Sequence, residues 1–66
     1  MADDRIQEAA KELRRIDRAK GERTVGIRYR DAAECGRAQG LVISDPEPER
    51  HDPLVDQILQ AAGPQS

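Results

Sequence analysis

Residues 24–44 read TVGIRYRDAAECGRAQGLVIS, and this stretch decides the fold that the sequence predicts. Its first seven residues alternate strictly, with Val25, Ile27 and Tyr29 on one side and Gly or polar residues on the other. Strict alternation is typical of a half-buried strand, whose successive side chains point to opposite faces. We therefore expect a strand that turns an apolar face inward and a basic face outward.

A second apolar run, residues 41–43, ends the stretch and predicts another strand. Between the two strands the sequence favours a short helix, because Asp31 and Glu34 form a capping-box pattern and Gly40 is a natural stop. A helix of about two turns fits a right-handed βαβ crossover, and it also fits an antiparallel pair with a long loop. The sequence leaves both layouts open.

A helix is predicted before this stretch. It begins near Asp4, whose capping box is completed by Gln7, and it ends before Gly21. Its apolar residues form one narrow stripe, which we expect to lie in the core or in a dimer interface. The candidate stripe consists of Ile6, Leu13 and Ile16.

A last helix is predicted over residues 53–63, with Asp52 as its N-cap and Gly63-Pro64 at its end. The preceding residues, 45–52, combine acids with prolines and predict an extended, negatively charged linker. One face of the helix is apolar and is a candidate interface for a groove on another protein. This face consists of Leu54, Val55, Ile58 and Leu59.

The expected fold class is therefore α+β, in a small single domain ordered helix, strand, short helix, strand, linker, helix. Residues 1–44 provide the first helix and a two-stranded core, residues 45–52 the linker, and residues 53–63 the amphipathic helix. A chain of 66 residues has a marginal core. Since the single cysteine cannot form an internal disulfide, we expect a homodimer to complete the fold.

Composition indicates a soluble cytoplasmic protein. One unpaired cysteine suits a reducing compartment. Acidic residues among the first twenty positions argue against a secretory signal, and no apolar run approaches the roughly 20 residues that span a bilayer. The abundance of Arg, Ala and Gly suits a GC-rich bacterial or phage genome.

The net charge of −2 conceals an asymmetry. Residues 1–40 carry ten Arg or Lys and eight acids, whereas residues 41–66 carry one Arg and five acids. A basic region followed by an acidic tail fits contact with nucleic acid, and it also fits a surface that is only solvated. The candidate contacts to a partner or to nucleic acid lie on the polar face of the first strand and close to it. They are Arg23, Arg28, Arg30 and Arg37.

Part of the stretch resembles a helix-turn-helix segment over about 15 residues. Ala32, Gly36 and Val42 stand at the spacing of its alanine, its turn glycine and its apolar residue. The chain departs from the pattern at Gly40, which falls inside the recognition helix, and at Pro46, which cuts that helix short. The resemblance implies DNA binding through the second helix.

No pattern in the sequence predicts catalysis, a metal or a cofactor. His51 is the only histidine and lies in the linker, where we expect water around it. One cysteine and one histidine do not fill a zinc site, and the glycine spacings match neither a P-loop nor a dinucleotide-binding motif. We therefore predict a non-enzymatic protein-interaction module, such as an inhibitor, adaptor or assembly factor. The alternative is a small DNA-binding transcriptional regulator that uses the basic strand face or the segment that resembles a helix-turn-helix.

Overall fold

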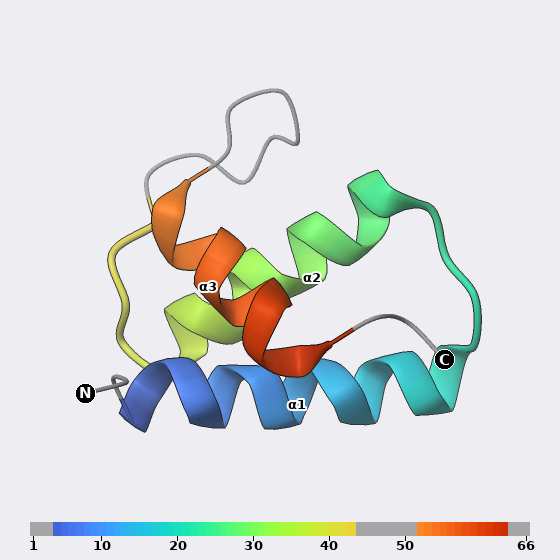
Figure 1. Cartoon of the computed structure of the whole chain (residues 1–66), viewed down its shortest axis with the longest axis horizontal. Helices are drawn as coiled ribbons and strands as arrows, with labels where there is room; N and C mark the ends of the chain where they lie inside the picture. Colours follow the sequence, from blue (N-terminus) through green and yellow to red (C-terminus); the bar gives the residue numbers. More distant parts are fainter. Residues whose placement is uncertain (1–3, 44–51, 64–66) are drawn as a thin grey trace.

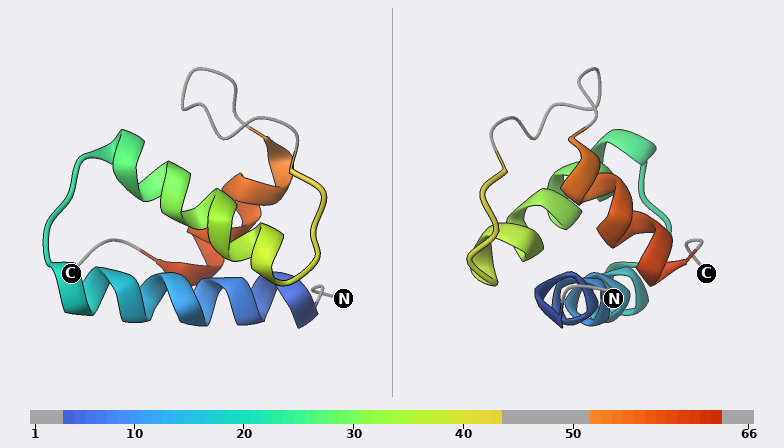
Figure 2. Two further views of the ribbon diagram at one scale, coloured as in Figure 1. Left: turned by 180° about the vertical axis from the view of Figure 1, so that it is seen from behind. Right: turned by 60° about the vertical axis from the view of Figure 1, so that its left-hand side comes forward.

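Three α-helices make up the described part of the computed structural model, which comprises residues 4–43 and 52–63. Helix α1 spans Asp4–Lys20, α2 spans Val25–Ala38 and α3 spans Pro53–Ala62. α2 runs back along α1, and α3 crosses α2, so that each helix packs against the other two (Figure 1). The views from behind and from the side show the same arrangement (Figure 2).

The predicted α+β class is wrong, because residues 4–43 and 52–63 contain no strand. The first predicted strand is the beginning of α2. Thr24 is the N-cap of α2, and its side chain accepts a hydrogen bond from the backbone N–H of Ile27 at 3.3 Å. The Arg28 N–H donates to the Thr24 carbonyl at 3.0 Å and so begins the helical hydrogen-bond ladder. The helix that the sequence predicts from Asp31 thus begins earlier in the chain.

The buried face of α2 explains why a helix forms here. Tyr29, Ala32, Ala33 and Gly36 are all buried, and they stand at positions i, i+3, i+4 and i+7. This spacing places them on one side of a helix. Three of the four residues are small, so a pattern based on large apolar side chains does not reveal this face.

Val25 and Ile27 do not share a buried face with Tyr29, as the strand prediction requires. Val25 is 81% exposed and Ile27 is 48% exposed. The strand preference of β-branched residues spans only about 1 kcal/mol. Because most helical stability in proteins comes from packing one face, the contacts of α2 with α1 and α3 outweigh that preference.

α2 ends in a turn that the sequence does predict at Gly40. This glycine has a φ of +90°, and its N–H donates to the Arg37 carbonyl at 2.9 Å. The Leu41 N–H donates to the Gly36 carbonyl at 3.0 Å. The two hydrogen bonds form a Schellman motif, in which glycine is favoured because it adopts positive φ without steric cost.

The second predicted strand is an extended segment without a strand partner among the described residues. Leu41 and Ile43 are buried, whereas Val42 is 86% exposed, so the side chains alternate as they would in a strand. Both buried side chains pack into the helical core. The Ile43 carbonyl accepts hydrogen bonds from the Arg37 guanidinium. A side chain thus satisfies a carbonyl that would bond to a neighbouring strand in a sheet.

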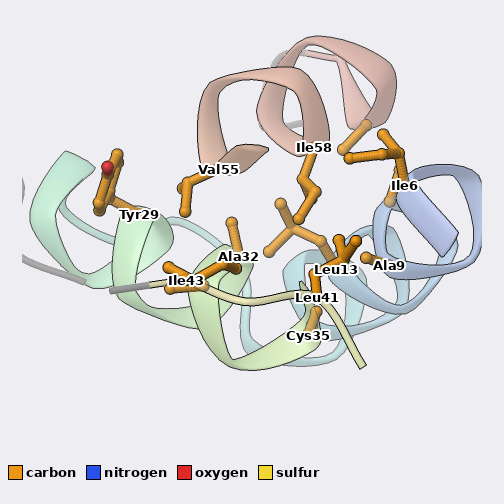
Figure 3. Close-up of a cluster of buried hydrophobic side chains, with 13 residues drawn as sticks. Ile6, Ala9, Leu13, Tyr29, Ala32, Cys35, Leu41, Ile43, Val55 and Ile58 are labelled. Atoms are coloured by element: carbon orange, nitrogen blue, oxygen red, sulfur yellow. The ribbon is translucent and has the colours of Figure 1, made fainter. Parts of the chain in front are cut away.

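The core receives apolar side chains from all three helices and from the segment after α2 (Figure 3). The largest fully buried side chains are those of Leu13, Tyr29, Val55 and Ile58. Alanines on α1 and α2 fill the space between them, which lets the helices approach closely. The buried apolar residues are Ile6, Ala9, Ala10, Leu13, Tyr29, Ala32, Ala33, Cys35, Leu41, Ile43, Val55, Ile58 and Ala62.

Both caps of α3 are the residues that the sequence predicts. The Asp52 side chain accepts a hydrogen bond from the Leu54 N–H at 2.9 Å, and Gly63, with a φ of +81°, ends the helix. Gly21 ends α1 with a φ of +75°, also as predicted. Asp4 differs from its predicted role as N-cap, because it is already the first residue of α1.

Some predictions lie outside the described residues. These are the linker over residues 45–51, including His51, and the proline that follows the last helix. Within the described residues, none of the helices combines the length and the apolar character needed to cross a membrane.

Candidate functional site

Two of the four predicted contact arginines are partly buried in a network of charges at the junction of α1 and α2. Arg23 pairs with Asp17 and Asp31, and the Arg28 Nε lies 3.0 Å from the Asp17 Oδ2. Asp17 is 4% exposed, and the side chain of Arg23 is 7% exposed. We call these four residues the charge network. Two cations and two anions leave it neutral, as burial of charge requires.

Arg28 also connects the network to α3. Its Nη2 donates a hydrogen bond to the carbonyl of Gly63, the C-cap of α3. Burial lowers the pKa of Arg28 through desolvation. A guanidinium nevertheless stays charged at neutral pH. Arg28 therefore serves as a cationic connector between three helices rather than as a free contact for a partner.

The other two arginines are exposed. Arg37 donates from Nε at 3.2 Å and from Nη2 at 2.8 Å to the Ile43 carbonyl, so its guanidinium holds the segment after α2. Arg30 faces solvent, and no ion pair or hydrogen bond holds its side chain within the described residues. The structure thus does not gather the four arginines on one surface.

The candidate interface on α3 faces the interior of this chain. Val55 and Ile58 are fully buried, and Leu54 and Leu59 are partly buried against the same core. The face that the sequence offers to another protein is thus occupied by α1 and α2.

The candidate stripe on α1 lies in the same core. Ile6 and Leu13 are buried, and Ile16 packs partly buried at the margin. Of the two sites that the sequence leaves open for this stripe, the core and a dimer interface, it occupies the core of its own chain.

The outer face of α1 carries a group of cations that are not among the contact residues predicted from the sequence. Lys11, Arg14, Arg15 and Arg18 are all exposed. They stand at positions i, i+3, i+4 and i+7, which places them side by side on one face of the helix. We call these four residues the basic stripe. The helical spacing of the cations is a signal that could have identified it from the sequence.

Two acids border the basic stripe. Glu8 lies 3.4 Å from Lys11, and Glu12 lies 3.3 Å from Arg15, measured between the charged atoms. The side chains of both pairs are largely exposed, with Arg15 at 78%. Exposed pairs of this kind contribute about 0.3–0.5 kcal/mol and exchange readily with other partners. The stripe therefore remains available to a competing anion.

Arg14 is the member of the stripe that contacts another helix. Its Nη1 donates to the Ala61 carbonyl of α3 at 3.3 Å. This hydrogen bond satisfies one of the carbonyls that the last turn of a helix leaves without a partner. It also limits the motion of the Arg14 side chain.

Cys35 is buried and unpaired. Burial raises the pKa of its thiol, Glu12 and Glu34 raise it further, and Arg23 acts in the opposite direction. The thiolate is the reactive form of cysteine, so these effects keep Cys35 in the unreactive form at neutral pH.

Comparisons with known proteins add no relative to this description. No family model matches the chain, and neither the curated proteins nor the solved structures contain a match to it.

Proposed function

We propose that this protein is a non-enzymatic protein-interaction module, acting as an inhibitor, adaptor or assembly factor, and that it binds through the outer face of α1. The basic stripe is the observation that supports this most directly. The buried residues of α1 pack into the core, and the stripe lies on the opposite side of the helix. A row of exposed cations attracts an oppositely charged surface and fixes its orientation.

The charge layout favours a protein partner over nucleic acid. Three of the four arginines that the sequence offers for phosphate contact, Arg23, Arg28 and Arg37, are held by contacts within the chain. Glu8 and Glu12 border the basic stripe and repel phosphates, whose neutralisation dominates affinity for nucleic acid.

We also propose a cytoplasmic setting, which the buried and unpaired Cys35 supports, since reducing compartments keep thiols free. A homodimer stays a prediction. Because Ile6 and Leu13 are buried inside the chain, such a dimer would need a surface other than the stripe that the sequence offers for it.

The test is an affinity capture from a lysate of the source cells, with and without nuclease, followed by mass spectrometry. The bait proteins are the wild type, the double variant Arg15→Glu/Arg18→Glu and the control Arg30→Glu. We expect one protein to survive nuclease treatment on the wild type and on Arg30→Glu, and to be lost from the double variant.

Two outcomes would contradict the proposed function. Capture that collapses on nuclease treatment would indicate nucleic-acid binding. If the wild type captures no specific protein, the proposal of a protein partner is contradicted. Circular dichroism of the three baits must first show equal helix content, so that a lost partner is not attributed to unfolding.

A further inference from the structure

The geometry of the basic stripe also limits the shape of its partner. Lys11 and Arg18 are seven residues apart, which corresponds to about 10.5 Å along the axis of an α-helix. Arg14 and Arg15 fill the space between them on the same face. The stripe is therefore about two turns long and only one residue row wide.

The borders of the stripe make it a narrow feature. Glu8 and Glu12 stand three residues before Lys11 and Arg15 respectively, and they pair with these two cations. On a helix three residues correspond to a net rotation of about 60° around the axis, so the acids form a row along one edge of the cations. A broad polyanion that covers both rows meets repulsion from the acids, whereas a narrow row of anions does not.

The support of the stripe is rigid. Behind it, Ile6, Ala10 and Leu13 fix α1 in the core, and Arg14 is held by the Ala61 carbonyl. A helix backbone that is ordered before binding loses little conformational entropy on association. A partner with matching spacing can therefore pair with several cations at once.

From this geometry we infer that the partner presents an α-helix with a row of carboxylates at positions i, i+3, i+4 and i+7, which lies along α1. Aspartate and glutamate on one face of a helix have the same periodicity as the basic stripe. Exposed ion pairs are individually weak, so we expect the complex to dissociate quickly, and added salt weakens it. This inference rests on the proposed function and identifies the chemistry of the partner.

The experiment uses two synthetic alanine-based helical peptides of equal length and net charge. In the first, four glutamates stand at i, i+3, i+4 and i+7. In the second, the four glutamates are distributed around the helix. Binding to the full-length protein is measured by fluorescence anisotropy of labelled peptides at low ionic strength, with a short duplex DNA as a third probe.

We expect the first peptide to bind at least about tenfold more tightly than the second, because only its carboxylates match the stripe. Arg18→Glu removes one exposed pair and adds a repulsion of similar size, so it should weaken this binding about three- to fivefold, whereas the matched control Arg30→Glu should change it less than about twofold. Both arginines are exposed and lack a hydrogen-bond or ion-pair partner within the described residues, so neither variant removes such a contact from that part of the chain.

Equal affinity for the two peptides, or none for either, would overturn the inference. Tighter binding to the duplex than to the first peptide would overturn it in favour of nucleic acid. These outcomes are separate from a failure of the proposed function. If the lysate partner is captured by Arg15→Glu/Arg18→Glu as well as by the wild type, the module binds a protein but does not use the basic stripe.

Discussion

Asp17 on α1 and Arg28 on α2 form an ion pair across the interface of their helices, with 3.0 Å between the Asp17 Oδ2 and the Arg28 Nε. The other oxygen of the same carboxylate contacts Arg23. One buried carboxylate therefore pairs with two guanidinium groups. If the charge of Asp17 is removed, Arg23 and Arg28 remain poorly solvated. Asp31, which pairs with Arg23, is then the one anion left in the network.

We expect Asp17→Asn to lower the free energy of unfolding by about 3–5 kcal/mol, the cost of breaking a buried ion pair from one side. For a small domain this is a large share of the total, so part of the variant should be unfolded without denaturant. Urea titrations followed by circular dichroism measure the difference. Glu8→Gln, which breaks only an exposed pair, is the control and should change stability by less than about 0.5 kcal/mol. Equal stability of Asp17→Asn and the wild type would show that the network does not hold the helices together.

Two isoleucine side chains approach Gly36 so closely that substitutions at Gly36 and at Ile43 should have coupled effects on stability. A Cβ at Gly36 would lie 2.5 Å from the Ile43 Cδ1 and 2.9 Å from the Ile58 Cδ1. Gly36→Ala gains about 1 kcal/mol of helix propensity but overpacks the core at a cost of about 1–3 kcal/mol. We expect a net loss of about 1 kcal/mol in a urea titration.

Ile43→Val removes the nearer of these two methyl groups. Introduced into this variant, Gly36→Ala should cost less than it costs in the wild type, and the four proteins form a double-mutant cycle. Additive effects within about 0.3–0.5 kcal/mol would show that the two positions do not compete for the same space.

Tyr29 is fully buried, and its hydroxyl accepts a hydrogen bond from the backbone N–H of Asp52, the N-cap of α3. Tyr29→Phe keeps the ring and removes the acceptor, so the amide loses this partner. We expect the free energy of unfolding to fall by about 1–3 kcal/mol. The amide resonance of Asp52 should shift in a nitrogen–proton correlation spectrum, while those of the first turn of α1 stay in place. An unchanged Asp52 resonance would contradict this role of the tyrosine.

Because the thiol of Cys35 is buried, we expect the protein to lose stability at alkaline pH. Its pKa is raised from the ordinary value of 9.0, first by burial and then by Glu12 and Glu34. The folded state therefore holds the thiol proton more tightly than the unfolded state does. This contribution is complete below pH 9.0 and is lost as the pH rises through the folded-state pKa. Urea titrations of the wild type and Cys35→Ala should give a stability difference that is constant between pH 7 and 8 and shrinks above pH 9. A difference that stays constant up to pH 10 would contradict the prediction.

The parts of the fold that could be predicted have local causes. Gly21, Gly40 and Gly63 adopt positive φ where the sequence ends helices, and Asp52 caps α3 through its own side chain. The identity of α2 has no such local cause. Its first turn contains residues that favour strands, and its buried face contains two alanines and a glycine, whose contribution appears only when two other helices pack on it.

The candidate site was harder to predict for a related reason. Arginine is usually exposed, so Arg23 and Arg28 were natural candidates for contact with a partner. Asp17 follows Leu13 by four residues, on the same face of α1, and an acid in such a place indicates a buried cation. The exposed cations, by contrast, follow the helical period along α1 and needed only that period to be recognised.

Arg28 and Tyr29 are neighbours in the chain, yet they hold opposite ends of α3. Arg28 binds the carbonyl of Gly63, and Tyr29 binds the amide of Asp52. Local opening of this one turn of α2 therefore releases α3 at both ends at once. The amide protons of α3 should exchange with deuterium through the same cooperative event as those of α2, rather than by fraying from either end.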